Sequence, residues 1–546
     1  MIDWVNNILP EIVLFGVTCV VMVLGLSKNL AWRNMVMPVC ALGLAVSGFV
    51  ALTTPVRGVV LLPELMPFAK AAIAGIAMLL LLLQEGAVDR FEERDIAKGV
   101  RPFDAIRTNR AEYYAFFMFS ITGLMLCTSA RDLVWLFLAL ELTSLPSYIM
   151  VAVSGVGRNG AHKSQEAAVK YFFLGALGAA TFLYGFAMIY GGTGTTNLVG
   201  ITDAIRLQGD ALNPILLAGL LISLVGLCFK IAAFPMHFYT PDVYQGAAAP
   251  VSAFLAFVPK AAGFFAIAQL MVAVGWTHGA SGNSLPEPIV MMLTVIAMLT
   301  MTLGNVLALW QHSVKRILAY SSVAHSGYML VGIIAGPGDG SFAKNGLAAV
   351  LFYLVAYGIT NVGAFAAVAC LERRKGDHVT EADDLSDIRG ICRTHPWVGI
   401  AFVVSALSLL GMPPALGFFA KLPLFTSGIS SGHLPLVIVL GLNSAIAAYY
   451  YLRLARIAWL ENPDDRREPV VPAPFESRHI AAMGSLLGII VLAVFGGTLM
   501  QGSANAFESA VSTSESVAVD DSELIQEMVD VLSVHTDPMG QFDIGR

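Results

Sequence analysis

Several charged side chains of this sequence lie inside long apolar runs. Glu141 occupies the middle of DLVWLFLALELTSLPSYIM, and Lys230 lies deep in ILLAGLLISLVGLCFKIAAFPMHF. A charged side chain at the centre of a bilayer costs about 2.5–3.5 kcal/mol, so charges retained there indicate a function. An unpaired carboxylate at this depth would take up a proton. We therefore expect Glu141 to pair with a buried lysine, with Lys230 as our choice, and the chemistry of such a pair is proton transfer.

Proline residues accompany the deep lysines. Pro235 follows Lys230 by five residues. Lys260 directly follows a proline in APVSAFLAFVPKAAGFF, and Lys421 lies seven residues after the proline pair of GMPPALGFFAKL. Proline removes a backbone donor and interrupts a helix, and in lipid the freed carbonyl groups need water or protein partners. We expect a hydrated interior beside these lysines and predict that all three take part in proton transfer.

Two further lysines lie closer to the ends of apolar runs. Lys70 is at the start of its run, and we expect it to extend to the membrane surface. Lys170 follows Glu166 by four residues, a spacing that favours an ion pair on a helix surface, so a surface role and a role in proton transfer stay open. Glu11 and Glu64 each follow a proline near a run end, and we expect interfacial or packing contacts for them.

Two histidines are candidates for passing protons between charged groups. Ser321, His325 and Tyr328 recur on one helix face. The next apolar run repeats this polar stripe at Tyr353, Tyr357, Thr360 and Asn361. Since a histidine titrates near neutral pH, we predict a relay role for His325. His237, just past the break at Pro235, is either a relay or a packed histidine.

A carboxylate and a lysine can form a proton switch. Burial can lower the pKa of a lysine to about 5–6, and a neighbouring carboxylate raises it again. A small displacement of one helix would therefore load or empty the lysine. Moving one charge against the membrane potential costs about 2.3 kcal/mol per 100 mV. The sequence contains no haem, iron–sulfur, zinc or nucleotide signature, so we expect this energy to come from partner subunits or an ion gradient.

The composition requires a membrane around these groups. Of the 546 residues, 57% are hydrophobic and only 13% are charged, against about 25% charged in soluble proteins. A helix needs about 20 apolar residues to span a bilayer. We predict an all-α polytopic membrane protein with about fourteen transmembrane helices, and scattered basic residues exclude nucleic acid as a partner. The predicted spans are 8–27, 33–53, 68–85, 113–129, 132–153, 168–190, 212–236, 245–275, 287–309, 316–336, 346–371, 396–427, 434–460 and 480–500.

The loops give an orientation. With the first loop in the cytoplasm, the alternating loops hold 22 lysines and arginines on that side and five on the other. This bias follows the positive-inside rule, and it places both termini on the non-cytoplasmic side. The C-terminal stretch 501–546 is polar and acidic, and we expect a tail outside the bilayer, with a short helix in SELIQEMVDVLSV.

Breaks in the helices suggest repeated halves. We expect discontinuous helices in the seventh and twelfth spans, and a break in the long eighth run, 245–275. Transporters place discontinuous helices at matching positions of repeated halves. The predicted division is a three-helix segment 1–112, five-helix repeats 113–275 and 287–460 of opposite orientation, a last helix 480–500 and the tail 501–546.

Four stretches carry a resemblance to a known family: LALELTSLPSYIM, CFKIAAFPMHFYTPDVYQGAAAPVSAFLAFVPKAAGFF, QHSVKRILAYSSVAHSGYMLVG and SLLGMPPALGFFAKLPLF. They resemble the antiporter-like subunits of respiratory complex I and of Mrp-type antiporters, and most of all the subunit N group of bacterial NADH-quinone oxidoreductases. The resemblance implies two inverted five-helix repeats and pump roles for Glu141, Lys230, Lys260 and Lys421. It implies relay roles for Lys170 and His325. A lysine at 421, where the subunit M type has glutamate, favours the N type.

The resemblance also implies the surroundings of the chain. No cofactor is expected in this subunit, and NADH, FMN, iron–sulfur clusters and quinone are expected in partner subunits. The implied partners are antiporter-like subunits of the M and L types and small membrane subunits in the bacterial inner membrane. Two alternatives stay open. One is a cation/proton antiporter subunit of Mrp type. The other is a structural membrane subunit that has lost pumping, which the complete set of Glu141 and the three deep lysines argues against.

Overall fold

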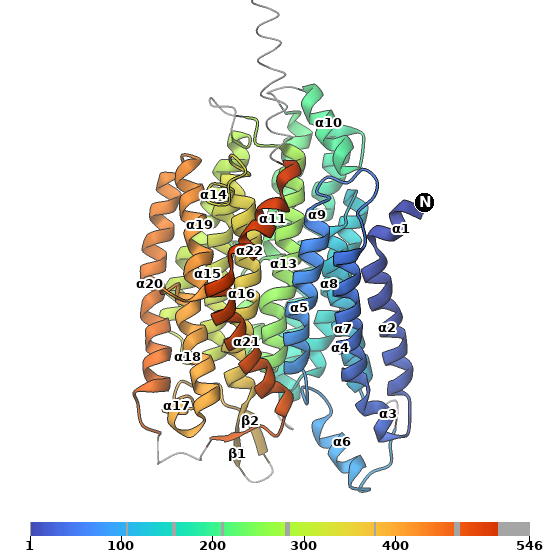
Figure 1. Cartoon of the computed structure of the whole chain (residues 1–546), viewed down its shortest axis with the longest axis vertical. Coiled ribbons are helices and arrows are strands. Elements are labelled where there is room, and N and C mark those ends of the chain that lie inside the picture. The colour runs from blue at the N-terminus through green and yellow to red at the C-terminus, as the bar shows by residue number, and fades with distance from the viewer. Residues whose placement is uncertain are drawn as a thin grey trace, which may run out of the picture.

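The structure is a computed structural model that describes residues 2–104, 108–155, 160–208, 212–278, 284–375, 378–463 and 470–510. Long helices run side by side along one common direction (Figure 1). Among the described residues, eleven helices are long and apolar enough to cross a membrane, and Leu9–Gly25, Pro214–Lys230 and Pro396–Leu410 are shorter apolar helices. Together these helices occupy the fourteen predicted spans, so the predicted polytopic helical fold is confirmed. The predicted short helix of the C-terminal tail lies outside the described residues.

The N-terminal segment contributes three long helices at one edge of the bundle (Figure 1). Its helices are α1 (Ile2–Asn7), α2 (Leu9–Gly25), α3 (Leu30–Asn34), α4 (Val36–Thr53), α5 (Leu65–Leu83) and α6 (Arg90–Ala97). α2 packs on α4 and α7, and α4 packs on α5. The polar helix α6, with no buried residues, lies outside the apolar bundle.

The middle of the chain builds the first group of helices around a broken one. Its helices are α7 (Arg110–Thr128), α8 (Leu133–Val153), α9 (Gly160–Thr193), α10 (Leu198–Gln208), α11 (Pro214–Lys230), α12 (Thr240–Gly246) and α13 (Ala249–Val274). The seventh predicted span ends as a helix at Lys230 and resumes as α12, so its discontinuity is confirmed.

The second group repeats this pattern. Its helices are α14 (Glu287–Leu309), α15 (Val314–Ala335), α16 (Gly346–Ala369), α17 (Ile391–Thr394), α18 (Pro396–Leu410), α19 (Leu416–Ser430) and α20 (Leu434–Trp459), followed by α21 (Glu476–Phe495) and α22 (Gly497–Asn505). The twelfth predicted span is divided into α18 and α19, so this break is confirmed as well.

The predicted break in the eighth run is wrong. α13 is one continuous helix that contains Pro259, and every residue from Ala249 to Val274 is buried. Proline is tolerated inside a membrane helix where neighbouring helices surround it. α13 packs against α7, α8, α11, α15 and α16. Together with the almost fully buried α15 and α16, it forms the centre of the bundle.

A small antiparallel sheet was not predicted. It contains β1 (Leu371–Lys375), β2 (His378–Glu381) and β3 (Val470–Pro472) in the order β2-β1-β3. Arg373 lies opposite Thr380 on one side and Val470 on the other. The sheet joins the loop after α16 to the loop before α21, at the lower end of the bundle in Figure 1.

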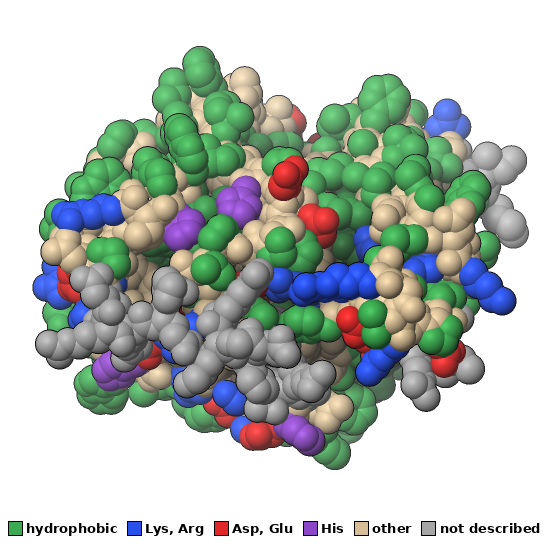
Figure 2. Space-filling model, turned by 90° about the horizontal axis from the view of Figure 1, so that it is seen from below, with side chains coloured by type: hydrophobic (Ala, Val, Ile, Leu, Met, Phe, Trp, Pro, Cys, Tyr) green, Lys and Arg blue, Asp and Glu red, His purple; other side chains and the backbone are tan. Residues whose placement is uncertain are grey.

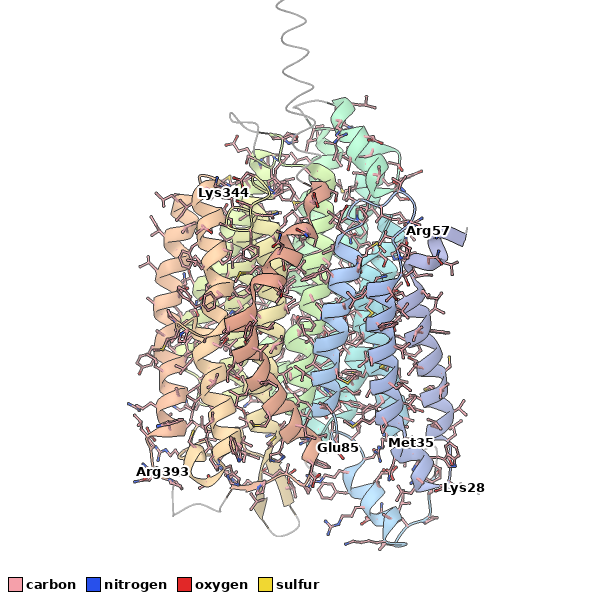
Figure 3. The ribbon with its side chains drawn as sticks, in the orientation of Figure 1. Lys28, Met35, Arg57, Glu85, Lys344 and Arg393 are labelled. Carbon is pink, nitrogen blue, oxygen red and sulfur yellow. The ribbon has the colours of Figure 1, made fainter. Side chains whose placement is uncertain are left out.

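The two ends of the bundle differ in charge. Lys28 and Arg393, from loops predicted on the basic side, lie at one end, and Arg57 and Lys344 lie at the opposite end (Figure 3). We call the end with Lys28 and Arg393 the basic end. Viewed from there, charged side chains lie across the middle of the face and at its left, right and lower edges, while hydrophobic side chains gather along its upper edge (Figure 2). This distribution fits a bundle whose sides contact lipid.

Candidate functional site

The predicted pair of Glu141 and Lys230 is present. Lys230 is the last residue of α11, and its Nζ lies 3.0 Å from Oε1 of Glu141 on α8. The same Nζ donates to the Ser144 hydroxyl at 2.6 Å and to the Leu140 carbonyl at 3.3 Å. The side chain of Lys230 is 1% exposed and that of Glu141 is 18% exposed. The ammonium group is therefore enclosed, while its carboxylate partner reaches the side of the bundle.

Protein groups satisfy the backbone around the break after Lys230. The Tyr239 hydroxyl donates to the Phe229 carbonyl at 2.9 Å, and Phe234 donates its N–H to the Thr300 hydroxyl at 3.0 Å. These contacts replace the helical hydrogen bonds that the break removes. Ala232 adopts a positive φ of 55°, which tightens the turn. Lys230 is thus held at the end of a helix whose backbone changes direction beside it.

Lys260 lies at the centre of the bundle and is connected to this break. Its Nζ donates to the Ser322 carbonyl and, at 3.0 Å, to the Ser326 hydroxyl. The Ser326 hydroxyl donates to the carbonyl of Ile231, the residue that follows Lys230. The Tyr357 hydroxyl donates to the Ser322 hydroxyl at 2.8 Å. The contacts of Lys260 therefore join α13 and α15 to the broken helix.

His325 has a hydroxyl at each ring nitrogen. Nδ1 lies 2.6 Å from the Tyr353 hydroxyl, and Nε2 lies 2.9 Å from the Tyr451 hydroxyl. The Tyr451 hydroxyl also hydrogen-bonds the Ser321 hydroxyl. A neutral imidazole donates from one nitrogen and accepts at the other, and a hydroxyl can do either. The arrangement can therefore pass a proton across the ring, as the predicted relay role requires.

Lys421 belongs to the second broken helix. Its Nζ donates to the carbonyl of Leu410, the last residue of α18, at 2.7 Å, and it lies 5.1 Å from the centre of the Tyr328 ring. Gly411, with φ of 86°, makes the turn between α18 and Lys421. Lys421 thus binds the helix end across the break, as Tyr239 does in the first broken helix.

A small cavity of about 10 Å³ lies between His325 and the second break. It has room for about one water molecule. Its lining residues are His325, Tyr353, Ala356, Tyr357, Thr360, Ser408, Leu409, Gly417 and Ala420. Tyr357 lies between His325 and Lys260. Its ring centre is 5.0 Å from that of His325 and 5.9 Å from Nζ of Lys260. The residues in order are Glu141, Lys230, Ser326, Lys260, Tyr357, His325 and Lys421, which we call the central series.

Lys170 lies outside the central series. It is 44% exposed and pairs with Glu166 at 2.8 Å and with Asp242 at 3.1 Å. Asp242 lies on α12 and also pairs with Arg316 at 2.8 Å. The surface pair with Glu166 is therefore present, and it extends into a charged network beside the first broken helix.

His237 is buried in the segment between α11 and α12. Its ring lies 4.4 Å from that of Phe238. Within the described part of the chain, Nδ1 has no hydrogen-bond partner. The structure does not bring His237 into contact with the central series.

The expectation that Lys70 extends to the surface is wrong. Its side chain is 2% exposed, and Nζ lies 2.7 Å from Oε1 of Glu11. Nζ also donates to the Asn7 carbonyl at 2.6 Å, and the Ser129 hydroxyl donates to Glu11 at 3.2 Å. Glu11 is therefore a buried counter-ion of Lys70. The error arose because its partner comes from another span, 59 residues earlier in the sequence.

Sequence reasoning also missed two buried contacts that join distant parts of the chain. Tyr451 hydrogen-bonds His325 from α20, 126 residues away. Lys315, counted among the loop charges, is buried and pairs with Glu381 of β2 at 2.7 Å. The run of three tyrosines at 449–451 could have indicated the contact of Tyr451 with His325. Nothing in the sequence indicated the pair of Lys315 with Glu381, because Glu381 belongs to the sheet that was not predicted.

Discontinuous membrane helices beside buried charged groups are typical of ion-translocating membrane proteins, and similarity to known proteins agrees with this class. Residues 130–447 match the family described as NADH:quinone oxidoreductase/Mrp antiporter, transmembrane region. The chain is 36% identical over 494 residues to NADH-quinone oxidoreductase subunit N of Trichlorobacter lovleyi, covering 89% of this chain and 94% of that protein. It belongs to the subunit N family of NADH-quinone oxidoreductases.

Solved structures share the fold. One chain of respiratory complex I from Thermus thermophilus is 29% identical, with a TM-score of 0.70 over 91% of this chain and 99% of that one. A chain of the Mrp complex from Dietzia sp. DQ12-45-1b is 18% identical, with a TM-score of 0.72 over 94% and 98% of the two chains. The second likeness concerns the fold alone.

Proposed function

We propose that Glu141, Lys230, Lys260 and Lys421 carry protons within this chain, with His325 as the relay between the last two lysines. The chain is a proton-translocating membrane subunit of NADH-quinone oxidoreductase. The observation that supports our assignment of residues is the ion pair of Glu141 with Lys230 at the end of a broken helix. It places a switchable charge pair beside an element that can move.

The ion pair of Glu141 and Lys230 controls whether Lys230 keeps or releases its proton. A carboxylate next to an ammonium group favours the protonated lysine, and its withdrawal in an apolar interior favours release of the proton. A shift of the segment between α11 and α12 would move Lys230 away from Glu141 and toward Ser326. The hydroxyl of Ser326 contacts Lys260 at 3.0 Å. Lys230 would then release its proton toward Lys260.

The second half of the route uses hydroxyl groups and a histidine. Lys260 contacts the backbone of Ser322, whose hydroxyl accepts from Tyr357. His325 joins two tyrosine hydroxyls and borders the cavity beside the α18–α19 break. The cavity would hold a water molecule that connects His325 with the second break. Lys421 then receives the proton where it binds the end of α18.

Lys170 and His237 lie outside the central series and would exchange protons with it. Lys170, Asp242 and Arg316 form a charged network that reaches the second half of the first broken helix. We assign this network to proton uptake from the basic end. His237 has an unpartnered Nδ1 among the described residues, and it would accept a proton when the segment around Pro235 moves.

The redox chemistry would lie in partner subunits. The relatives that this chain matches are named as one subunit, N, of NADH-quinone oxidoreductase. We assign NADH, FMN, the iron–sulfur clusters and quinone to other subunits of the complex. Antiporter-like subunits of the M and L types and small membrane subunits would be its neighbours in the bacterial inner membrane.

The second candidate function is a cation/proton antiporter subunit, because the family description that residues 130–447 match also covers Mrp antiporters. Purification from native membranes separates the two. We expect NADH:quinone reductase subunits to co-purify with this chain. An isolated assembly that exchanges Na⁺ for H⁺ without redox partners would contradict the first function.

The role of Lys230 can be tested with three substitutions. We expect Lys230→Ala to lower NADH-driven acidification of inverted vesicles several-fold, because it removes the proton carrier. Lys344→Ala is the matched control, since Lys344 is exposed and pairs with Asp339 in a loop. Lys230→Arg keeps a positive charge beside Glu141 but cannot release its proton, so we expect it to fail like alanine.

NADH oxidation with an artificial electron acceptor would show that the complex is assembled in each variant. Equal pumping by Lys230→Ala and Lys344→Ala would remove Lys230 from the route. Full pumping by Lys230→Arg would show that its charge, and not its proton, is used.

A further inference from the structure

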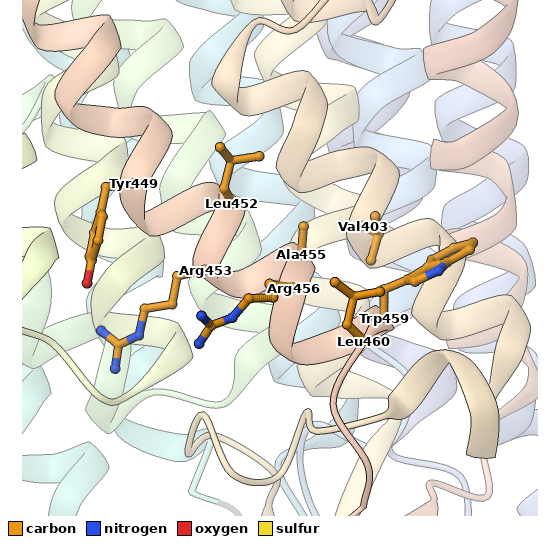
Figure 4. Close-up of a pocket in the computed structure, with 8 residues that line it drawn as sticks. All are labelled: Val403, Tyr449, Leu452, Arg453, Ala455, Arg456, Trp459 and Leu460. Carbon is orange, nitrogen blue, oxygen red and sulfur yellow. The ribbon is translucent and has the colours of Figure 1, made fainter.

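A groove on the side of α20 is not used by the central series. It has a volume of about 570 Å³ and lies along the last three turns of α20, facing α18. Its lining residues are Val403, Tyr449, Leu452, Arg453, Ala455, Arg456, Trp459 and Leu460 (Figure 4). The stretch YYYLRLARIAWL supplies all of these residues except Val403.

The floor of the groove carries two arginines. Figure 4 shows the guanidinium groups of Arg453 and Arg456 pointing to the same side of α20. Arg456 is 63% exposed, and its carboxylate contact is with Glu461 at 3.3 Å. Glu461 is shared with Arg389 at 3.1 Å. Arg453 makes one long hydrogen bond, 3.5 Å, to the Leu309 carbonyl. Arg389 and Arg456 thus share one carboxylate, while Arg453 contacts a carbonyl, and the groove keeps a positive charge.

The walls of the groove are apolar and aromatic. Tyr449, Leu452, Trp459 and Leu460 are all exposed. Leu452 lies above the arginines in Figure 4, toward the middle of the bundle, and Trp459 ends the helix at the basic end. Tryptophan and tyrosine gather where a membrane meets water, because their rings have an apolar body and a polar tip. The groove therefore crosses from the headgroup level into the apolar part of the membrane.

We propose that this groove binds an anionic phospholipid of the leaflet at the basic end. The phosphate of its headgroup accepts from Arg453 and Arg456, since guanidinium groups bind phosphate oxygens through paired hydrogen bonds. One acyl chain runs along Leu452 and Val403, and Trp459 packs at the glycerol level. Basic pockets on the cytoplasmic side of membrane helices recognise anionic headgroups in this way. A helix of a partner subunit is the other possible occupant, and it would have to present acidic groups to both arginines.

Brominated lipids can locate the occupant in the whole complex. Complex purified with this chain is placed in vesicles of brominated phosphatidylglycerol or brominated phosphatidylcholine, and tryptophan fluorescence is measured. A parallel Trp459→Phe complex gives the contribution of Trp459 by difference. We expect the anionic lipid to quench Trp459 much more strongly than the zwitterionic lipid. Free inorganic phosphate should not reverse this quenching, because it lacks the acyl chains.

A double substitution tests the arginines. We expect Arg453→Gln/Arg456→Gln to weaken the preference for phosphatidylglycerol by about tenfold or more. Arg94→Gln/Arg101→Gln is the matched control, since it removes the same charge from exposed positions at the same end. Arg453→Lys/Arg456→Lys keeps the charge and should keep part of the preference.

Three outcomes would overturn the proposal. Equal quenching of Trp459 by the two lipids would show that headgroup charge is not recognised. An unchanged preference in the Arg453→Gln/Arg456→Gln complex would remove the arginines from the site. No quenching of Trp459 by either lipid would show that a partner subunit covers the groove.

Discussion

Four of the buried lysines, Lys70, Lys230, Lys260 and Lys421, differ in the oxygen atoms that surround them. Lys70 and Lys230 each meet a carboxylate, at 2.7 and 3.0 Å. Lys260 and Lys421 donate to carbonyl and hydroxyl oxygens. A charge fixed by a buried partner is costly to leave alone, whereas a lysine among neutral oxygens can exist with or without its proton. Lys260 and Lys421 can therefore change protonation where they lie, whereas Lys230 must first move away from Glu141.

The pair of Lys70 and Glu11 should be a structural ion pair. We expect Lys70→Met to destabilise the chain by about 3–5 kcal/mol, because it leaves the Glu11 carboxylate buried without its partner. The double variant Glu11→Gln/Lys70→Met should recover most of the loss. Thermal unfolding of the purified complex measures both. A single variant as stable as the wild type would show that water reaches Glu11.

The central residues could be predicted from sequence only one helix at a time. Glu141 and Lys230 were found because each is a charge in an apolar run, and their pairing was expected because an unpaired carboxylate there would take up a proton. The Lys70–Glu11 pair and the contact of His325 with Tyr451 were not found. Each joins two distant spans, and an apolar run does not specify which other run it packs against.

The breaks in two helices place the functional lysines at helix ends. Lys230 ends α11, and Lys421 binds the carbonyl that ends α18. A helix end carries carbonyl groups without intrahelical partners, so it attracts a cation. The breaks could be predicted because proline interrupts a helix in lipid. That α13 continues through Pro259 could not, since its continuity depends on the helices that enclose it on every side.

Gly411 should be essential to the second break. It has a φ of 86°, and an added Cβ would lie 2.8 Å from Cδ of Lys421. We expect Gly411→Ala to displace Lys421 from the Leu410 carbonyl and to lower proton pumping. Gly75→Ala is the control, since an added Cβ there meets nothing within 4 Å. Vesicle acidification compares the two, and normal pumping by Gly411→Ala would show that the turn tolerates the strain.

The polar helix α6 should loosen as pH rises. Burial raises the pKa of Asp89, next to the start of α6, from 3.8 to about 6, and the charges of Glu92 and Glu93 add to this effect. Between about pH 4 and pH 6 the folded carboxyl keeps a proton that the unfolded chain loses. The local stability therefore falls as pH rises through this window and stays lower above it.

Hydrogen exchange of α6, corrected for the intrinsic pH effect, measures this change. We expect protection to fall between about pH 4 and pH 6 in the wild type and to stay lower above pH 6. Asp89→Asn stays neutral and keeps an acceptor for the Asn109 N–H, so its protection should not change. The same loss of protection in Asp89→Asn would exclude Asp89 as the cause.

The molecule as a whole is a bundle with unlike ends. The number of spans could be predicted because bilayer thickness fixes the length of each apolar run. The small sheet at the basic end could not. Its strands are only three to five residues long and pair residues 371–373 with residues 470–472, so they lack any periodicity that a sequence could reveal.

The orientation of this bundle can be tested by labelling. An excess of basic loops at one end predicts that this end faces the cytoplasm. Lys344 and Arg393 lie at opposite ends (Figure 3). In intact spheroplasts an impermeant maleimide should therefore label Lys344→Cys at once, and Arg393→Cys only after the membrane is opened. The wild type corrects for Cys19, whose side chain is exposed. The reverse order of labelling would show that the basic end faces away from the cytoplasm. The Lys170 network would then face the side to which protons are released.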